Sequence, residues 1–184
     1  MSVTYGAGGS TVGYSAALAQ KVQDNGMPAL AHLTCVKADE AKLADVLGQL
    51  HGFGVKNILA LRGDIPADMQ GEEIGSFAHA SELMRFVKQQ GDFCVGGAAY
   101  PEGHPESGSL EQDIENTKYK VDAGVDFLVT QMFFDNTILY NYMFRLLRAG
   151  INVPVVPGIM PVTNAKQIIR ICQLSGTKLP PQFR

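Results

Sequence analysis

The sequence predicts an α/β fold with a parallel sheet, and within that class it favours a (β/α)8 barrel of the TIM type. Three observations lead to this prediction. Short apolar runs alternate with segments of helical periodicity along all 184 residues. Most of the runs are apolar without alternation, which is typical of strands covered on both faces. Nearly every run also ends in polar residues, as expected where the carboxyl ends of barrel strands form an active site.

Six apolar runs are the expected strands. In chain order they are Ser2–Thr4, Ala29–Cys35, Asn57–Leu61, Phe93–Ala99, Asp126–Thr130 and Val153–Val156. About six of the eight β/α units of a barrel are therefore present, and we expect a single, partial domain over residues 1–184 that is truncated at both ends. An open barrel exposes sheet edges and core, so we expect instability or aggregation of the isolated chain.

The segments between these runs have helical periodicity. In residues 37–50 the apolar positions 43, 46, 47 and 50 follow the i, i+3, i+4, i+7 spacing of one helical stripe. Ser109 and Gln112 form a capping-box pattern, and Asn136 and Asn164 are expected to cap the last two helices. Glycines are expected just past three helix ends, at Gly54, Gly124 and Gly150.

Composition excludes several classes of function. The net charge is −3 and no basic run occurs, so we expect neither a nucleic-acid partner nor an anionic membrane. No apolar stretch approaches the length of a membrane span, and no secretory signal is visible. The three cysteines are far apart and form no CxxC pair, which predicts neither disulfides nor a metal site and favours a reducing, cytoplasmic compartment.

Two strand-to-helix junctions are dense in polar groups. Arg62, Gly63 and Asp64 directly follow an expected strand, where they either bind a polar ligand or form an ion pair that caps the strand. Residues 100–106 crowd Tyr100, Glu102, His104 and Glu106 into one loop stiffened by two prolines. This loop is either a ligand site at the active-site face or a rigid turn with solvated carboxylates.

The helix after this loop has Asp113, Asn116 and Lys120 on one face. They are either an ordinary solvated face or a site where Lys120 meets a phosphate. Two other candidates are weaker. Residues 6–11 are a glycine-rich segment that fits no dinucleotide or Walker pattern. His32 is more often a hydrogen-bonded core residue than a catalyst.

Gln131 follows an expected strand. Its amide both donates and accepts hydrogen bonds, which suits a pterin-like ring edge, and the alternative is a cap at the strand end.

Together these segments resemble the methylenetetrahydrofolate reductase family. The similar motifs occur in the family's order over essentially the whole chain, and they are Val3–Thr11, Ala31–Cys35, Ile58–Asp64, Ala99–Glu106, Thr130–Gln131 with Phe133–Asp135, and Pro157–Pro161. A pterin-binding methyltransferase would share the barrel, but these ordered motifs lie outside its pattern.

The resemblance implies an FAD-containing barrel enzyme. NADH or NADPH would reduce the flavin, and 5,10-methylenetetrahydrofolate would then be reduced to 5-methyltetrahydrofolate, in one-carbon metabolism that supplies methionine synthesis. The protein's task would be to place the flavin and tune its electronics. We also expect the full-length protein to form a homo-oligomer.

The resemblance also implies roles for individual residues. The expected FAD contacts are Thr4, His32, Arg62, Gly63, Asp64, Ala80, Tyr100, His104, Asp113, Asn116 and Lys120. Gln131 and Gln167 would bind the folate, and Thr4, Tyr5 and Ala7 would border the nicotinamide. Asp64 would lie between flavin and folate, where its charge stabilises a cationic iminium form of the substrate.

Two departures from the family pattern matter. Tyr119 stands where some relatives have a basic residue near the FAD phosphates, so Lys120 would make that contact alone. The family's general acid is a glutamate on the first barrel strand, which this sequence does not include. Glu102 and Glu106 match a different motif, so neither is assigned that role. A flavin- and folate-binding fragment without catalysis is therefore the alternative.

Overall fold

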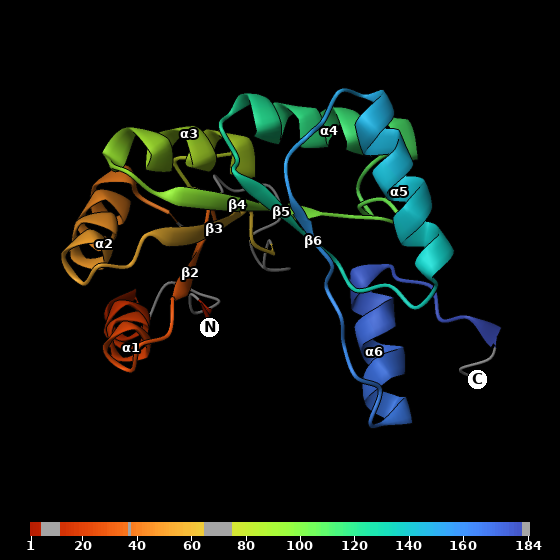
Figure 1. Cartoon of the computed structure of the whole chain (residues 1–184), viewed down its shortest axis with the longest axis horizontal. Coiled ribbons are helices and arrows are strands. Elements are labelled where there is room, and N and C mark those ends of the chain that lie inside the picture. Colours follow the sequence, from red (N-terminus) through yellow and green to blue (C-terminus); the bar gives the residue numbers. More distant parts are fainter. Residues whose placement is uncertain (5–11, 37, 65–74, 182–184) are drawn as a thin grey trace. The chain divides into compact units, whose positions relative to one another are not determined.

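The computed structural model describes residues 1–4, 12–36, 38–64 and 75–181. Strands and helices alternate along these residues (Figure 1), and their bounds are β1 Ser2–Val3, α1 Val12–Asp24, β2 Leu30–Thr34, α2 Glu40–Gly52, β3 Asn57–Leu61, α3 Ala80–Gln90, β4 Cys94–Ala99, α4 Leu110–Asp122, β5 Phe127–Thr130, α5 Asn136–Arg148, β6 Val155–Val156 and α6 Ala165–Ser175. All six predicted strands are confirmed, with ends that agree within two residues.

The strands form one sheet in the order β1-β2-β3-β4-β5-β6. The pairs β1–β2, β2–β3, β3–β4 and β5–β6 are parallel, and in the second of these His32 is opposite Leu59 and Thr34 opposite Leu61. Sequential parallel strands, each followed by a helix, make this an α/β fold of the TIM-barrel type. The predicted fold class is confirmed to this extent.

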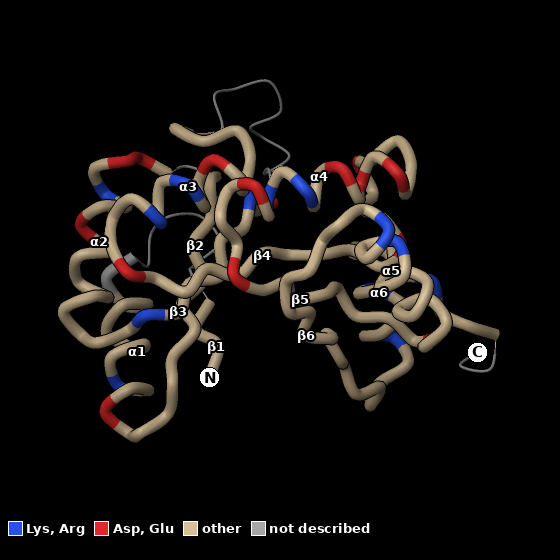
Figure 2. The backbone as a smooth tube through the Cα atoms, turned by 45° about the horizontal axis from the view of Figure 1, so that its top comes forward, with Lys and Arg blue, Asp and Glu red and all other residues tan. Residues whose placement is uncertain are grey.

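Charged residues lie on the helices and loops, whereas the strands contain no Asp, Glu, Lys or Arg (Figure 2). Burying an unpaired charge costs several kcal/mol or more, so strands of this composition suit a sheet that is covered on both faces. The charged side chains of the described residues therefore lie outside the strands, on the helices and in the loops that follow the strand ends.

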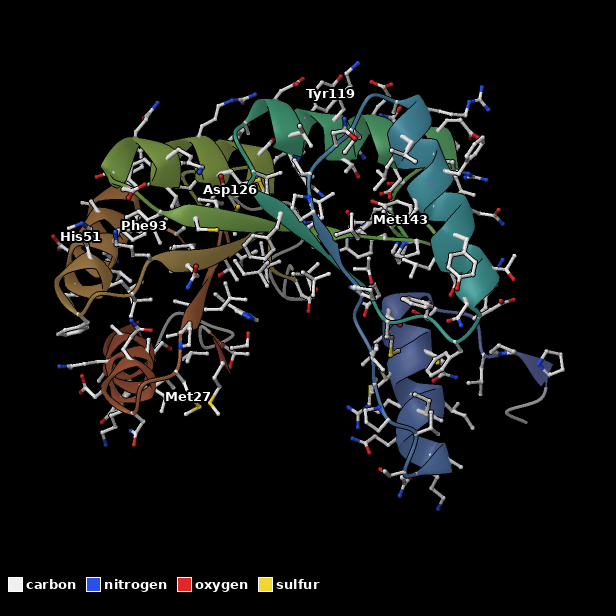
Figure 3. All side chains as sticks on the ribbon, viewed as in Figure 1. Met27, His51, Phe93, Tyr119, Asp126 and Met143 are labelled. Atoms are coloured by element: carbon white, nitrogen blue, oxygen red, sulfur yellow. The ribbon has the colours of Figure 1, made fainter. Side chains whose placement is uncertain are left out.

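The chain forms two compact units, residues 1–97 with 123–126, and residues 98–122 with 127–184. In the first unit, α1 packs beside α2 and α2 beside α3 (Figure 1). The predicted apolar stripe of α2 is fully buried, from Leu43 to Leu50. Figure 3 shows His51 and Phe93 pointing toward one another, and their ring centroids are 6.1 Å apart.

The expectation that a single domain spans residues 1–184 stays a prediction.

In the first unit, Asp126 and Lys88 make polar contacts at the beginning of β4. The Asp126 carboxylate, labelled in Figure 3, accepts hydrogen bonds from the Val95 N–H and from Lys88 Nζ, both at 2.6 Å. Lys88 Nζ also donates to the Phe93 carbonyl at 3.0 Å. In barrels of this type the amino-terminal ends of the strands serve stability rather than catalysis, and this contact fits that role.

The second unit has its own small core. Met132, Ile168 and Cys172 are buried there, with Phe134, Met160, Ile171 and Leu179 packed against them.

The helix starts of the second unit test the predicted caps. The Ser109 hydroxyl accepts from the Gln112 N–H at 3.1 Å, and the Asn164 carboxamide oxygen accepts from the Gln167 N–H at 3.0 Å, so both residues cap their helices as predicted. The Gln112 side chain donates to Asn116 at 3.3 Å, so the cap at Ser109 is confirmed but the capping box is not. The prediction for Asn136 is wrong. Asp135 is the cap and accepts from the Thr137 N–H at 2.8 Å.

The three glycines predicted past helix ends all have positive φ, between 72° and 93°. Among the described helices, none is long and apolar enough to cross a membrane.

Candidate functional site

In the first unit, the ends of β2 and β3 lie side by side. The backbone N–H groups of Cys35 and Val36 both donate to the Arg62 carbonyl, at 3.0 and 3.1 Å. Gly63 follows with a φ of 84°, and a Cβ atom there would lie 3.2 Å from Thr34 Cβ. A glycine is therefore needed for this turn, because it accepts the left-handed backbone and the close approach together. The Arg62–Gly63 junction is thus fixed beside the end of β2.

His32 lies on β2, the strand that pairs with β3, which the Arg62–Gly63 junction follows. Its Nε2 atom is within hydrogen-bond distance of the Ser2 hydroxyl. The ring is half-buried, and burial lowers the pKa of His32 below its usual 6.5. The imidazole is therefore neutral at pH 7, with one donor and one acceptor nitrogen. This agrees with a hydrogen-bonded residue and gives no sign of a charged catalyst.

The remaining predicted residues of the first unit lie on separate elements. Thr4 is exposed just after β1, and its carbonyl accepts from the Ser15 hydroxyl at 3.2 Å. Asp64 is exposed after β3. Ala80 begins α3, and the Glu82 carboxylate caps this helix by accepting from the Ala78 N–H at 2.8 Å. Tyr5, Ala7 and the whole glycine-rich segment 6–11 lie outside the described residues.

Cys35, at the end of β2, is not a reactive thiol. It is fully buried, and its Sγ donates to the Leu61 carbonyl at 3.4 Å. Burial, helped by the negative charge of Glu82, raises the pKa of Cys35 to about 12. The thiol stays protonated at neutral pH and packs as a small apolar group. Cys94 and Cys172 are also free cysteines.

In the second unit, the loop after β4 and helix α4 together form an aromatic and cationic cluster. The Tyr100 and His104 rings meet edge to face, with centroids 4.6 Å apart and planes at 89°. Lys120 Nζ lies 5.7 Å from the centroid of the Tyr100 ring and donates to the Ala98 carbonyl at 2.7 Å. Burial lowers the pKa of Lys120, an effect that the negative charge of Asp113 opposes.

Asp113 connects the loop to the helix. Its side chain is buried, with 4% of the residue exposed, and its Oδ1 accepts from the His104 N–H at 3.3 Å and the Ser107 hydroxyl at 3.1 Å. Asn116 Nδ2 donates to the same Ser107 hydroxyl at 3.5 Å. Asp113 is thus no part of a solvated face. Asp113 and Asn116 hold the loop that contains His104, whereas Lys120, on the same predicted face, donates to the Ala98 carbonyl of β4.

Figure 3 shows Tyr119 extending outward from α4, and 55% of this residue is exposed. Lys120, by contrast, points inward to the Ala98 carbonyl. The basic group next to the Tyr100 ring is therefore Lys120, and its neighbour Tyr119 faces solvent.

The two predicted folate-binding glutamines lie on different elements of this unit. Gln131 follows β5, where its N–H donates to the Ala99 carbonyl at 2.7 Å and its side-chain oxygen accepts from the Met132 N–H at 2.9 Å. That geometry favours the cap at the strand end that the sequence left as an alternative. Gln167 is exposed in the first turn of α6.

Sequence reasoning missed two contacts of this site. Ser107 joins Asp113 to Asn116, but a serine in a loop has no spacing that would reveal such a role. The sequence alone assigns Glu102 no role. In the structure its carboxylate accepts from the backbone N–H of Lys178, 76 residues further along the chain, and no local pattern predicts such a distant contact.

The similarity to known proteins extends over nearly the whole chain. A sequence model of the family "Methylenetetrahydrofolate reductase" matches residues 1–184. The chain is 36% identical over 181 residues to the 5,10-methylenetetrahydrofolate reductase of Escherichia coli, covering 98% of this chain and 60% of that protein. It is also 36% identical over 195 residues to methylenetetrahydrofolate reductase (NADH) 1 of Arabidopsis thaliana, covering 98% of this chain and 33% of that protein.

A solved structure shares the fold. It is an uncharacterized protein from Clostridium thermocellum that binds two copies of 5-methyl-5,6,7,8-tetrahydrofolic acid, with a TM-score of 0.58, 14% identity, and coverage of 88% of this chain and 53% of that one. The chain thus spans about a third to three-fifths of the length of the curated relatives named above.

Proposed function

Because the chain belongs to the methylenetetrahydrofolate reductase family, we propose that its protein reduces 5,10-methylenetetrahydrofolate to 5-methyltetrahydrofolate with electrons from NADH or NADPH. The name of the plant relative specifies NADH, which supports a nicotinamide donor. The structural neighbour binds 5-methyltetrahydrofolate, the product expected here. The proposal includes a place in one-carbon metabolism that feeds methionine synthesis, in the cytoplasm.

The cluster of Tyr100, His104 and Lys120 is the observation on which this proposal rests. The residues of the second unit fit FAD by their chemistry. An aromatic face suits a ring system, and an ammonium group suits a phosphate. The hydroxyl of Ser107 and the carboxamide of Asn116 suit a ribose or phosphate oxygen.

In the first unit, Arg62, Gly63 and the neutral His32 offer further donors for FAD, and we propose Thr4, Asp64 and Ala80 as additional contacts. A bound flavin would supply two-electron chemistry, accepting hydride from the nicotinamide and passing it to the folate. The chain's residues bind and orient the reactants for that chemistry. Thr4, Tyr5 and Ala7 would border the nicotinamide.

We propose Gln131 and Gln167 as the residues that bind the folate. Asp64 would stabilise positive charge on the substrate through its carboxylate. We further propose that the complete protein closes an eight-unit (β/α)8 barrel and forms a homo-oligomer.

The test is spectroscopic and kinetic. The purified protein should show the absorption bands of bound flavin, consume NADH or NADPH, and release 5-methyltetrahydrofolate detectable by chromatography. A colourless protein that takes up no added FAD would contradict the proposal. A protein that binds FAD and folate but leaves NADH and NADPH unoxidised would instead be the binding-only fragment.

A further inference from the structure

Glu102 joins two parts of the second unit that are distant in sequence. It lies in the loop after β4, two residues beyond Tyr100 and two before His104. Both of its carboxylate oxygens are 3.2 Å from the backbone nitrogen of Lys178, which donates to them. Lys178 belongs to the short segment Gly176–Leu179 that follows α6, called here the post-α6 segment.

Two further contacts hold the post-α6 segment in the same place. Gly176 ends α6 with a φ of 72°, and a Cβ atom there would come 3.0 Å from Pro105 Cγ, so the segment closely approaches the loop after β4. The Thr177 hydroxyl is buried and donates to the Met132 carbonyl at 3.3 Å. Leu179 packs against the apolar cluster around Met132. The segment therefore packs against Met132 and its apolar neighbours and also donates a hydrogen bond to Glu102.

The Glu102 carboxylate accepts a hydrogen bond, although its surroundings also favour its protonated form. The residue is half-buried, and its carboxylate accepts from the backbone N–H of Lys178. Burial raises the pKa of Glu102, and Asp135 adds to this effect, while the Lys178 N–H and the charge of Lys178 oppose it. A carboxylate accepting a backbone N–H is a strong, charge-assisted contact.

We propose that Glu102 is a positioning residue that ties the post-α6 segment to the loop after β4 and thereby holds Tyr100 and His104 in place for the cofactor. The proposal rests on the proposed function, since it takes Tyr100 and His104 as cofactor contacts. It also links α6, which contains Gln167, to this loop, so that the Glu102 side chain helps to hold the helix proposed to bind folate beside the loop proposed to bind FAD.

Three variants test it in the protein. Glu102→Ala removes the acceptor, whereas Glu102→Gln keeps an oxygen that can accept from the Lys178 N–H but removes the charge and any acid function. Glu115→Ala, an exposed glutamate on α4, is the matched control. Hydrogen–deuterium exchange of the peptide containing Lys178 reports the contact itself. Titration with FAD and the rate of NAD(P)H oxidation report whether Tyr100 and His104 are held in place for the cofactor.

We expect Glu102→Ala to speed exchange at Lys178 roughly tenfold and to weaken FAD binding by a similar factor, since a hydrogen bond to a charged group is lost. Glu102→Gln should restore both to within about threefold of wild type, and Glu115→Ala should change neither.

Unchanged exchange in Glu102→Ala would overturn the tie. Faster exchange with unchanged FAD affinity would overturn the positioning role. Equal loss of turnover in the Ala and Gln variants, with normal FAD binding, would make Glu102 an acid instead. A wild-type protein that binds no FAD would overturn the proposed function itself, and the exchange result would still report the contact.

Discussion

Lys120 Nζ lies 5.7 Å from the centroid of the Tyr100 ring, with its hydrogen bond to the Ala98 carbonyl directing it inward. A partly buried ammonium group is costly to desolvate, and here its hydrogen bond and the aromatic ring offset that cost only in part. The lowered pKa of Lys120 expresses that cost.

We therefore predict opposite effects of Lys120→Gln on binding and on stability. FAD affinity should fall roughly ten- to hundredfold, because a charge-assisted contact to phosphate is lost. The unfolding free energy of the FAD-free protein should stay unchanged or rise, because a buried charge is removed. Titration with FAD and chemical denaturation measure the two quantities. Lys118→Gln, on the exposed side of the same helix, should alter neither, and a similar loss of affinity there would contradict the assignment.

A second prediction concerns pH and His32. Burial lowers the pKa of His32 in the folded state below the 6.5 of the unfolded chain. Between these two values the unfolded chain binds more protons, so the unfolding free energy should fall as the pH drops below about 6.5. His32→Asn should remove this part of the pH dependence, whereas His51→Gln, an exposed histidine on α2, should keep it. Denaturation curves from pH 7.5 to 5 measure the unfolding free energy, and the same dependence on pH in wild type and His32→Asn would refute the prediction.

A third prediction concerns the Asp126 contact with Val95 and Lys88. Asp126→Ala leaves the Val95 N–H and the Lys88 ammonium without their shared acceptor. We expect a loss of about 1–2 kcal/mol in unfolding free energy, a value already reduced because both side chains are partly solvated. Asp92→Ala removes the acid of a far more exposed ion pair with Lys56 and should cost less. Equal losses in the two variants would show that the backbone hydrogen bond adds nothing.

A fourth prediction concerns Gly158. Its N–H donates to the Thr130 hydroxyl at 2.8 Å, and a Cβ atom on it would overlap the Thr130 carbonyl oxygen. Gly158→Ala must displace backbone, and we expect it to cost about 1–3 kcal/mol. Gly48→Ala is the control, because nothing lies within 4 Å of a Cβ atom there and the site is in a helix. Replacement there should be neutral or stabilising by up to about 1 kcal/mol. A harmless Gly158→Ala in thermal melts would contradict the overlap.

Most of the fold could be predicted from local patterns. The α2 stripe from Leu43 to Leu50 lies buried as its spacing predicts, because helical periodicity alone determines which side chains share a face. The cap at Asn136 failed because Asp135, one residue earlier, has an equally good capping side chain, and periodicity does not distinguish neighbours. The residues proposed to bind FAD could be named from the resemblance but not placed.

The sequence by itself determined the order of strands and helices, the uncharged strands, the polar strand ends and the family. These features depend on residues close together in the chain, or on motifs in a fixed order. Only the tertiary structure decided that Asp113 is buried beneath the loop containing His104, that Lys120 turns inward beside Tyr100, and that Glu102 accepts from Lys178. The physical reason is that burial, pKa and hydrogen-bond partners depend on neighbours in space, and the residues that supply them are up to 76 positions apart.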